Sequence, residues 1–363
     1  MTVSAELLPG IGDGGESTFA AFLRDSPFAA YQQSPAFAAA QPGHARREWS
    51  RFVARDAGGA IVAAAMVRHT RLAMGYWLAT LQRGPVVHDP AWLPRIVPLL
   101  CTTLREAGCC SVQLAPRVRG RALPDIADAL RAEGFAPLPP ARQPIHTRTG
   151  IVWLDKPEDA ILAGFKQRGR RAIRAAAKDG VLVRRVESAS DLEQYQRLLD
   201  RFAAARPGYD MSGQLDARGQ HALIGALGGA MLLAERDGSA TGAHAFVRQA
   251  NEAIWLSLAT LTDGGGASPG YALLWDAMRR ARVMGCVGYD LAGIPLAAPA
   301  DAGEAGRYQF KSAFAPSPRV LPPMQMRPLS PLPHGVLLGA RDAFRALRSA
   351  RAHRTPPAGV AHG

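Results

Sequence analysis

The sequence predicts an α/β protein of two domains, because one strand, helix and strand unit occurs twice. In the second half of the chain, the apolar run at residues 253–261 is typical of a buried strand, and a glycine-rich loop follows it. Residues 271–284 place apolar side chains on one helical face, Gly285 ends that helix, and a second strand is expected at residues 287–291. Two strands joined in this way pair in parallel through a right-handed crossover.

The first half repeats this order. A strand is expected at residues 74–81, a helix at residues 92–107 that stops at Gly108, and a strand at residues 111–115. A duplicated unit is the economical explanation, and 363 residues suffice for two domains of ordinary size. The predicted fold class is therefore α/β (α+β), with each domain a mixed sheet flanked by helices.

The first domain is expected to cover residues 1–150. Ser34 followed by proline indicates the start of a helix, and residues 51–55 and 61–69 are typical of a hairpin. The proline-rich segment 136–144 is the expected crossing to the second domain.

The second domain is expected to cover residues 151–318 and to hold the active-site stretch 253–311. One helix is expected from Pro157, which has two acidic residues just after it, to Gly180. The other expected elements are a strand at residues 181–186, a helix with a capping box of Ser190 and Glu193, and a hairpin of residues 231–235 and 241–248.

Charge and cysteine content narrow the classes of function. The chain carries 43 Lys and Arg against 30 Asp and Glu, a formal net charge of +13. This balance favours a polyanionic partner such as RNA or an anionic headgroup, although a basic proteome would give the same number. The four cysteines show no ligand spacing, so neither a metal site nor a disulfide framework is expected. Without a signal peptide or a long apolar run, the sequence predicts a cytoplasmic protein.

Five short motifs occur in one order within residues 25–330. They are Gln82-Arg-Gly-Pro85, Arg171-Ala-Ile-Arg174 with Lys178-Asp-Gly-Val181, Tyr271-Ala-Leu-Leu-Trp275, Tyr289-Asp-Leu-Ala-Gly-Ile294 and Phe310-Lys-Ser-Ala-Phe314. Each motif is weak, but the ordered set resembles the Fem-type non-ribosomal peptidyltransferases. The resemblance implies two tandem GNAT-like domains with a cleft between them, and a strand within residues 319–335 that rejoins the first domain. It also implies transfer of an amino acid from aminoacyl-tRNA to an amine of a peptidoglycan precursor, without a cofactor.

The resemblance also assigns site residues. Aminolysis of an ester builds negative charge on the carbonyl oxygen, and an aimed cation or N–H group lowers the barrier by about 3–4 kcal/mol. Phe310 and Lys311 are the catalytic residues that the resemblance implies. Without the motif around it, Lys311 would be interpreted as a surface lysine after a strand. Substrate contacts are expected from five residues, Arg206, Tyr209, Tyr271, Tyr289 and Asp290.

Structural alternatives to these assignments stay open. Arg206 and Tyr209 could be a cation at a helix end and a packed ring, whereas Tyr289 and Asp290 could be a buried tyrosine and a capping aspartate. His244 lies in an alternating strand and is expected to be structural.

The contacts to tRNA are expected from the basic helix that ends at Gly180. Its candidate residues are Lys166, Arg170, Arg171 and Arg174. Residues 34–41 contain no lysine of the kind that contacts nucleotide phosphates in some Fem enzymes, and the long helical hairpin of other members is absent. The basic tail at residues 336–363, helical or disordered, suits either tRNA or an anionic membrane surface, which would make the protein peripheral at the inner membrane face.

Two alternative functions remain. An acyl-CoA-dependent N-acyltransferase of the GNAT type would bind pyrophosphate at the glycine-rich loop 264–270, but this loop lacks the usual opening arginine or glutamine, and Pro269 removes a donor. A basic module that binds RNA or a membrane without chemistry is the second alternative. The intact Phe310 and Lys311 pair argues against it.

Overall fold

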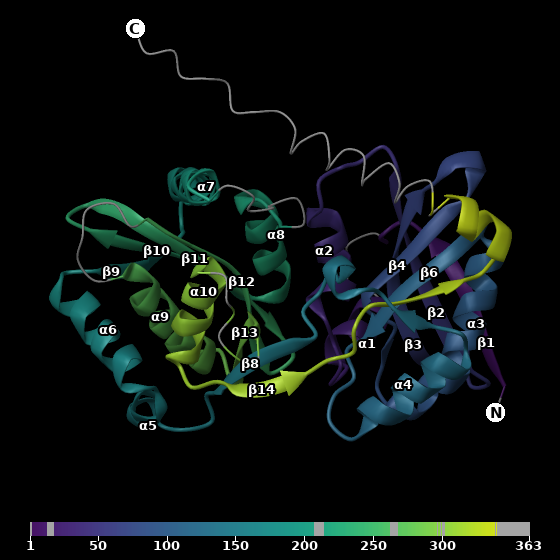
Figure 1. Cartoon of the computed structure of the whole chain (residues 1–363), viewed down its shortest axis with the longest axis horizontal. Helices are drawn as coiled ribbons and strands as arrows, with labels where there is room; N and C mark the ends of the chain where they lie inside the picture. The colour runs from purple at the N-terminus through teal and green to yellow at the C-terminus, as the bar shows by residue number, and fades with distance from the viewer. Residues whose placement is uncertain are drawn as a thin grey trace, which may run out of the picture.

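The protein consists of two lobes, each built around its own mixed sheet. The computed structural model describes residues 2–12, 18–206, 214–261, 268–295, 297, 299, 302–337 and 339. An 8-stranded sheet and a 7-stranded sheet lie side by side, each with helices packed on it (Figure 1). The predicted fold class, two α/β units with mixed sheets, is confirmed.

The first sheet has the strand order β1-β2-β3-β4-β6-β15-β7, with β5 paired to β3. Its strands are β1 Val3–Pro9, β2 Arg47–Asp56, β3 Ile61–Arg71, β4 Trp77–Arg83, β5 Val86–Val87, β6 Cys109–Pro116, β7 Ala136–Pro137 and β15 Gln325–Pro328. The expected hairpin is β2 and β3, and the repeated unit is β4 and β6 in parallel.

Helices cover both faces of the first sheet. They are α1 Thr18–Asp25, α2 Pro35–Ala40, α3 Leu93–Glu106 and α4 Ala122–Ala132. α3 and α4 share one apolar core with β2, β3, β4 and β6, whereas α1 packs on the opposite face. The sequence prediction missed β1 and α4, because no residue of β1 is fully buried and α4 buries only Ile126 and Leu130.

The second sheet has the strand order β14-β8-β13-β12-β11-β10-β9. Its strands are β8 Arg148–Trp153, β9 Leu182–Arg185, β10 Gly229–Arg236, β11 Ser239–Gln249, β12 Glu252–Thr260, β13 Gly288–Gly293 and β14 Ser317–Val320. The expected strands at residues 253–261 and 287–291 are confirmed as β12 and β13, which pair in parallel.

Helices also cover both faces of this sheet. They are α5 Glu158–Gly164, α6 Gln167–Lys178, α7 Ala189–Ala204, α8 Ala217–Leu227, α9 Pro269–Val283 and α10 Ala302–Ser312. α5, α6 and α9 bury their apolar faces in one core, and α7 and α8 do so on the other side of the sheet. α8 was not predicted.

The single helix expected between Pro157 and Gly180 is wrong, because the chain forms α5 and α6 with an extended break between them. At the break, Phe165 is buried and packs edge-to-face on Trp275 and Phe314. The backbone N–H of Lys166 donates to the carbonyl of Ala313 at 2.9 Å. A continuous helix would lose both contacts.

The expected capping box is also displaced by two residues. Ser188, not Ser190, caps α7, and its hydroxyl accepts from the backbone N–H of Asp191 at 3.1 Å. The Asp191 carboxylate accepts from the Ser188 N–H at 3.0 Å, which completes the box.

The two lobes touch through helices and are joined by two chain crossings. α2 lies beside α8, where a Cβ on Gly219 would stand 2.9 Å from the carbonyl of Ala40 (Figure 1). The chain enters the second sheet at β8 and returns to the first at β15, which inserts between β6 and β7. The division at residue 150 stays a prediction.

Candidate active site

The second sheet contains an opening between two parallel strands. β12 and β13 pair at only three positions, from Glu252 with Gly288 to Ile254 with Asp290. β12 then continues to Thr260 without pairing to β13, and a bulge separates Asp290 from Gly293. The backbone groups of the two strands do not pair with each other across this strand opening, and side chains bond some of them in place of a partner strand, as Lys311 bonds the carbonyl of Gly293.

Lys311 reaches into the strand opening from α10. Its Nζ donates to the carbonyl of Gly293 on β13 at 2.8 Å and lies 4.7 Å from the ring centroid of Trp255 on β12. Trp255 is the first residue of β12 beyond the last pair with β13. The ammonium therefore contacts both strands at the point where they separate, and the aromatic ring stabilises its charge.

Burial makes the Lys311 ammonium less stable than one in water. Desolvation lowers its pKa to about 8, while the Asp290 carboxylate acts in the opposite direction. Asp290 is itself buried, which raises its pKa, and it accepts a hydrogen bond from the N–H of Ala292 at 2.8 Å. Lys311 stays mostly protonated at neutral pH, and a negative oxygen beside it would stabilise it further.

Phe310 belongs to an aromatic cluster beside the opening. Its ring centroid is 4.7 Å from that of Tyr271, 5.5 Å from that of Phe314 and 6.3 Å from that of Trp255. Ring atoms of Phe310 lie 3.4 Å from where a Cβ on Gly270 would be. The glycine thus lets the ring cover the first turn of α9, and Phe310 holds α10 against the opening.

Tyr289 lies in the core beneath the opening. It is fully buried, and its hydroxyl is 2.6 Å from Nε2 of His244. The Nδ1 of His244 is 2.6 Å from the carbonyl of Ser257, so Nδ1 donates and Nε2 accepts the proton of Tyr289. This geometry gives Tyr289 a packing role in this structure, and its contact with substrate stays a prediction; His244 is buried in the same network.

Arg206 interacts with its own helix. Its guanidinium donates to the carbonyl of Phe202 at 3.1 Å and stacks on the Phe202 ring at 3.6 Å. It therefore caps the C-terminus of α7 in this structure, and its contact with substrate stays a prediction. Tyr209 lies outside the described residues.

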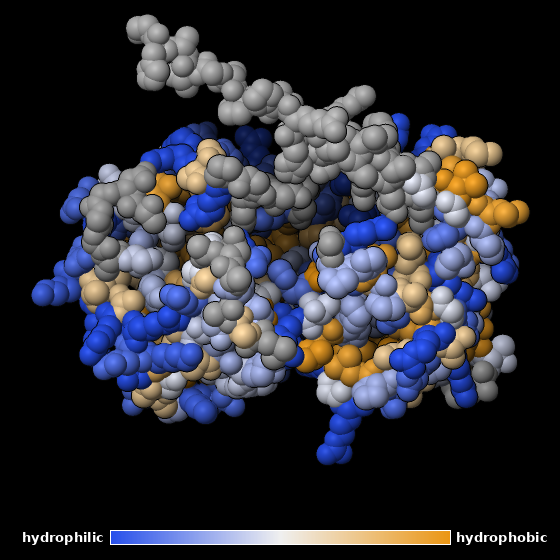
Figure 2. Space-filling model, viewed as in Figure 1, coloured by the Kyte–Doolittle hydropathy of each residue, from blue (hydrophilic) through white to orange (hydrophobic). Residues whose placement is uncertain are grey.

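The four expected tRNA residues divide into two groups. Lys166, Arg171 and Arg174 are exposed and make no ion pair within the described part of the chain. Arg170 is half-buried, and its guanidinium donates to the carbonyls of Ala163 and Phe165 at the end of α5. Hydrophilic side chains gather over α6 on the visible face (Figure 2). Arg170 thus stabilises α5, and the other three cations stay available.

A buried ion cluster joins the two lobes, and sequence reasoning missed it. The carboxylate of Glu252 on β12 accepts hydrogen bonds from Arg117, Arg119 and Arg319 at 2.7–3.1 Å. These cations hold the pKa of Glu252 at about 2 even though burial alone would raise it. The cluster fixes the first-lobe loop after β6 against the edge of the strand opening.

A second interlobe contact lies closer to Lys311. Arg83, at the end of β4, is buried and donates to the backbone carbonyl of His146 in the segment before β8. The imidazole of His146 packs against Gly293, whose carbonyl receives Lys311, so that a Cβ on Gly293 would overlap the ring. The surface is hollowed between the lobes (Figure 2).

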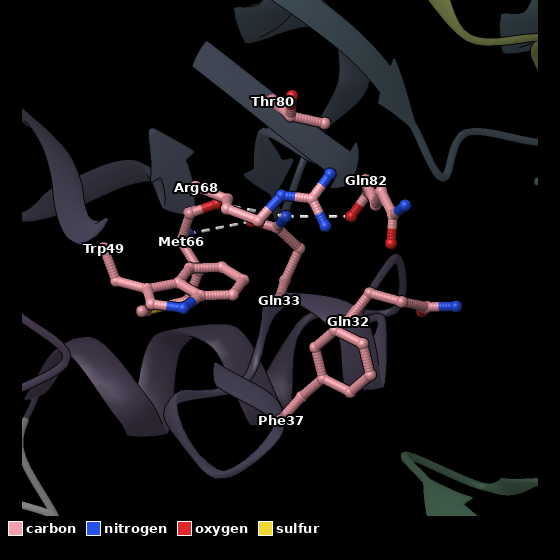
Figure 3. A pocket seen from close by; sticks show the side chains of 8 residues that line it. All are labelled: Gln32, Gln33, Phe37, Trp49, Met66, Arg68, Thr80 and Gln82. Carbon is pink, nitrogen blue, oxygen red and sulfur yellow. Dashed lines mark hydrogen bonds between the residues drawn. The ribbon is translucent and has the colours of Figure 1, made fainter. Parts of the chain in front are cut away.

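The first lobe has a small cavity of its own. Gln33, Phe37, Trp49 and Arg68 are among its lining residues, and its volume is about 10 Å³ (Figure 3). The amide of Gln33 bridges the carbonyl of Gln82 and the N–H of Met66, which closes the cavity on one side. This space holds about one water molecule, so it is no substrate site in this conformation.

The described residues were also searched for metal sites, disulfides and membrane-spanning helices. Within them, no group of three His, Cys, Asp or Glu side chains could hold a metal ion. The cysteines Cys101, Cys109, Cys110 and Cys286 are all free and buried. None of the described helices is long and apolar enough to cross a membrane.

Comparisons with known proteins agree with this architecture. Residues 163–312 match the family model described as an acetyltransferase (GNAT) domain. A structure of FemX has 16% identity and a TM-score of 0.73, over 88% of this chain and 97% of the FemX chain. A search of curated proteins gives no match.

Two further solved structures share the fold less closely. The structure of L-PGS from Bacillus licheniformis has 12% identity and a TM-score of 0.52, over 86% of this chain and 92% of that one. A tandem GNAT protein from the clavulanic acid biosynthesis pathway has 12% identity and a TM-score of 0.51, over 90% and 99%. The chain therefore has the tandem GNAT-like fold seen in FemX, and its second lobe carries a GNAT domain.

Proposed function

We propose that this protein is an aminoacyltransferase, which moves an amino acid from aminoacyl-tRNA to an amine of a peptidoglycan precursor. The observation that carries the proposal is the Lys311 ammonium in the opening between β12 and β13. An ester carbonyl placed in this opening would put its developing negative oxygen beside a poorly solvated cation. The likeness to FemX supports the choice of reaction.

The donor assignment rests on the exposed cations of α6. Lys166, at the N-terminus of α6, bonds through its backbone to Ala313, two residues after Lys311. If the tRNA backbone lay along Lys166, Arg171 and Arg174, the end of the tRNA that carries the amino acid could therefore lie near the strand opening. The reaction would take place where charged tRNA is found, in the cytoplasm. Membrane contact through residues 336–363 stays a prediction.

Acyl-CoA is the second candidate donor, and the GNAT domain match favours it. In that case the pyrophosphate would approach the N-terminus of α9. There Pro269 offers no N–H, and the Phe310 ring covers Gly270. These two features reduce the donors accessible to a pyrophosphate, so we place acyl-CoA second.

A donor competition tests the proposal. The protein would be incubated with nucleotide-linked or lipid-linked muramoyl pentapeptide, together with either tRNA charged with radiolabelled amino acids or labelled acetyl-CoA. We expect label to pass from tRNA to the peptide, and mass spectrometry to find one added amino acid. Transfer from acetyl-CoA alone would establish the second candidate, and transfer from neither donor would refute both.

A further inference from the structure

We infer that His146 is the general base of this site, which accepts a proton from the attacking amine of the acceptor. The inference rests on the proposed acyl transfer and adds a residue that none of the sequence motifs contains. Lys311 can stabilise an oxyanion, but as an ammonium it cannot accept a proton. The site therefore requires a second group, neutral and accessible, beside the Lys311 ammonium.

His146 meets these requirements by its position. It lies on the segment between the lobes, directly before β8, and the residue keeps part of its surface exposed to solvent while its ring packs on Gly293. Its ring occupies the space that a side chain at Gly293 would fill, and the carbonyl of Gly293 bonds Lys311. The imidazole and the ammonium are thus held around one peptide unit, at the open end of the separated strands.

The polar surroundings leave the imidazole free to act. Its ring nitrogens make no hydrogen bond with any described residue, whereas its backbone carbonyl is held by Arg83. The charged groups that face it are Lys311 from α10 and Arg83 from the end of β4. Desolvation of the ring by the atoms packed around it, and then the charges of Lys311 and Arg83, lower the pKa of His146 to about 4, so the ring is neutral at physiological pH.

The chemistry balances with this residue as the proton carrier. The acceptor amine attacks the ester carbonyl carbon, and the oxygen of that carbonyl becomes negative beside Lys311. A C–N bond forms while one proton passes from the attacking nitrogen to the imidazole. The C–O bond to the tRNA ribose then breaks, and the imidazolium returns the proton to the leaving ribose oxygen.

The other titratable groups nearby fit this role less well. Asp290 is buried behind the opening, and its carboxylate is engaged by the N–H of Ala292. His244 and Tyr289 are fully buried and bonded to each other. Among the described groups around Lys311, His146 combines exposure with an unengaged nitrogen.

Kinetics of matched variants test the inference. With charged tRNA and muramoyl pentapeptide, His146→Gln should lower kcat on the order of 10²-fold with little change in acceptor KM. Gly293→Ala should act in the same direction, because its methyl group displaces the ring while the carbonyl that receives Lys311 remains. His221→Gln, an exposed histidine on α8, is the control and should be unaffected. Imidazole in the buffer should partly restore His146→Ala.

A titration separates failure of this inference from failure of the proposed function. By NMR, the His146 ring should titrate below 6.5, and Lys311→Met should raise that value because one repelling cation is lost. If the wild type transfers label and His146→Gln matches it, the base is another group and the function stands. If the pKa of His146 does not change in Lys311→Met, His146 does not lie beside Lys311 and the inference is wrong. If the wild type is inactive with every donor, both the inference and the proposed function are wrong.

Discussion

The two lobes share one strand, helix and strand unit, but they use it differently. In the first lobe, β4 and β6 pair without separation along the whole of β4, from Trp77 with Cys109 to Arg83 with Pro116. In the second lobe, β12 and β13 pair at three positions and then part. The first sheet has thus no opening of this kind, whereas the second has one with a buried ammonium in it.

The difference teaches that duplication of a fold does not duplicate a site. The gap between the strands, and not the unit itself, distinguishes the second lobe, because the Lys311 ammonium lies where the two strands part. The first lobe contributes in another way, through Arg83, Arg117 and Arg119, which reach the second lobe from the ends of β4 and β6. Under the proposed function, the first lobe would form a wall of the site and the second lobe would hold the reacting groups.

Lys311→Met should give the largest effect. Removal of the cation should lower kcat on the order of 10²–10³-fold and leave acceptor binding nearly intact, because the ammonium acts mainly on charge that develops in the transition state. Single-turnover rates and acceptor titrations would measure the two quantities. A loss of affinity at unchanged turnover would instead make Lys311 a binding residue.

The cations of α6 should matter more than those of the first lobe. Replacing Lys166, Arg171 and Arg174 with glutamine should reduce the loss of tRNA affinity between 50 and 200 mM salt by about 20–40-fold, since each phosphate contact adds about 0.7–0.9 to the salt slope. Filter binding over a salt series would measure this slope. Arg95 and Arg105, exposed on α3, are the control pair. If the α6 variant and the α3 variant have equal slopes of log affinity against log salt, the cations of α6 only face solvent and do not contact tRNA.

The pH dependence of turnover should report the pKa of Lys311. Because that pKa is lowered to about 8, the protonated fraction falls as the pH rises through 8, and kcat should drop about tenfold per unit above it. In Lys311→Arg the fall in kcat should move to higher pH, since the guanidinium stays charged. If kcat of Lys311→Arg falls at the same pH as in the wild type, the titrating group is not Lys311.

The free energy of unfolding should rise with pH over the range in which kcat falls. A cation with a lowered pKa in the folded state opposes folding most strongly below pH 8, and this cost fades as the pH rises from about 8 to 10.5. Lys311→Met should remove this rise, which urea unfolding at several pH values would detect.

Tyr289→Phe should have the smallest effect on chemistry. The change leaves Nε2 of His244 buried without a partner, which should cost about 1–3 kcal/mol of unfolding free energy, while kcat changes less than about threefold. Tyr271→Phe is the matched comparison, because the Tyr271 hydroxyl makes no hydrogen bond with described residues and its loss should spare stability. A large fall in kcat for Tyr289→Phe would return Tyr289 to the substrate contacts.

The elements that the sequence predicted well are those with strong local patterns. The apolar runs of β12 and β13, the amphipathic face of α9 and the glycine at its end are all visible within short windows. The break at Phe165 was missed because its cause, a hydrogen bond to Ala313, lies far along the chain. Gly164, directly before the break, is only a weak local signal against a continuous helix, and the tertiary contacts of Phe165 and Lys166 decide the outcome.

The candidate site likewise has features that the sequence predicts and features that depend on the fold. Lys311 was found through the motif around it, but its contacts with Gly293 and Trp255 depend on how two strands separate. The arginines around Glu252 come from two distant segments, the loop after β6 and strand β14, and no spacing in the sequence brings them together. Burial of Tyr289 likewise could not be distinguished from exposure, since a strand end and a strand interior share the same residue types.

The insertion of β15 between β6 and β7 has a consequence for how the protein is made. When the ribosome has produced the first 150 residues, β6 still has an open edge, and its neighbour has not been synthesised. The first lobe therefore cannot complete its sheet until every strand of the second sheet has been synthesised. We expect the nascent first lobe to need protection from aggregation during that interval, and a chain cut before Gln325 to expose the same edge permanently.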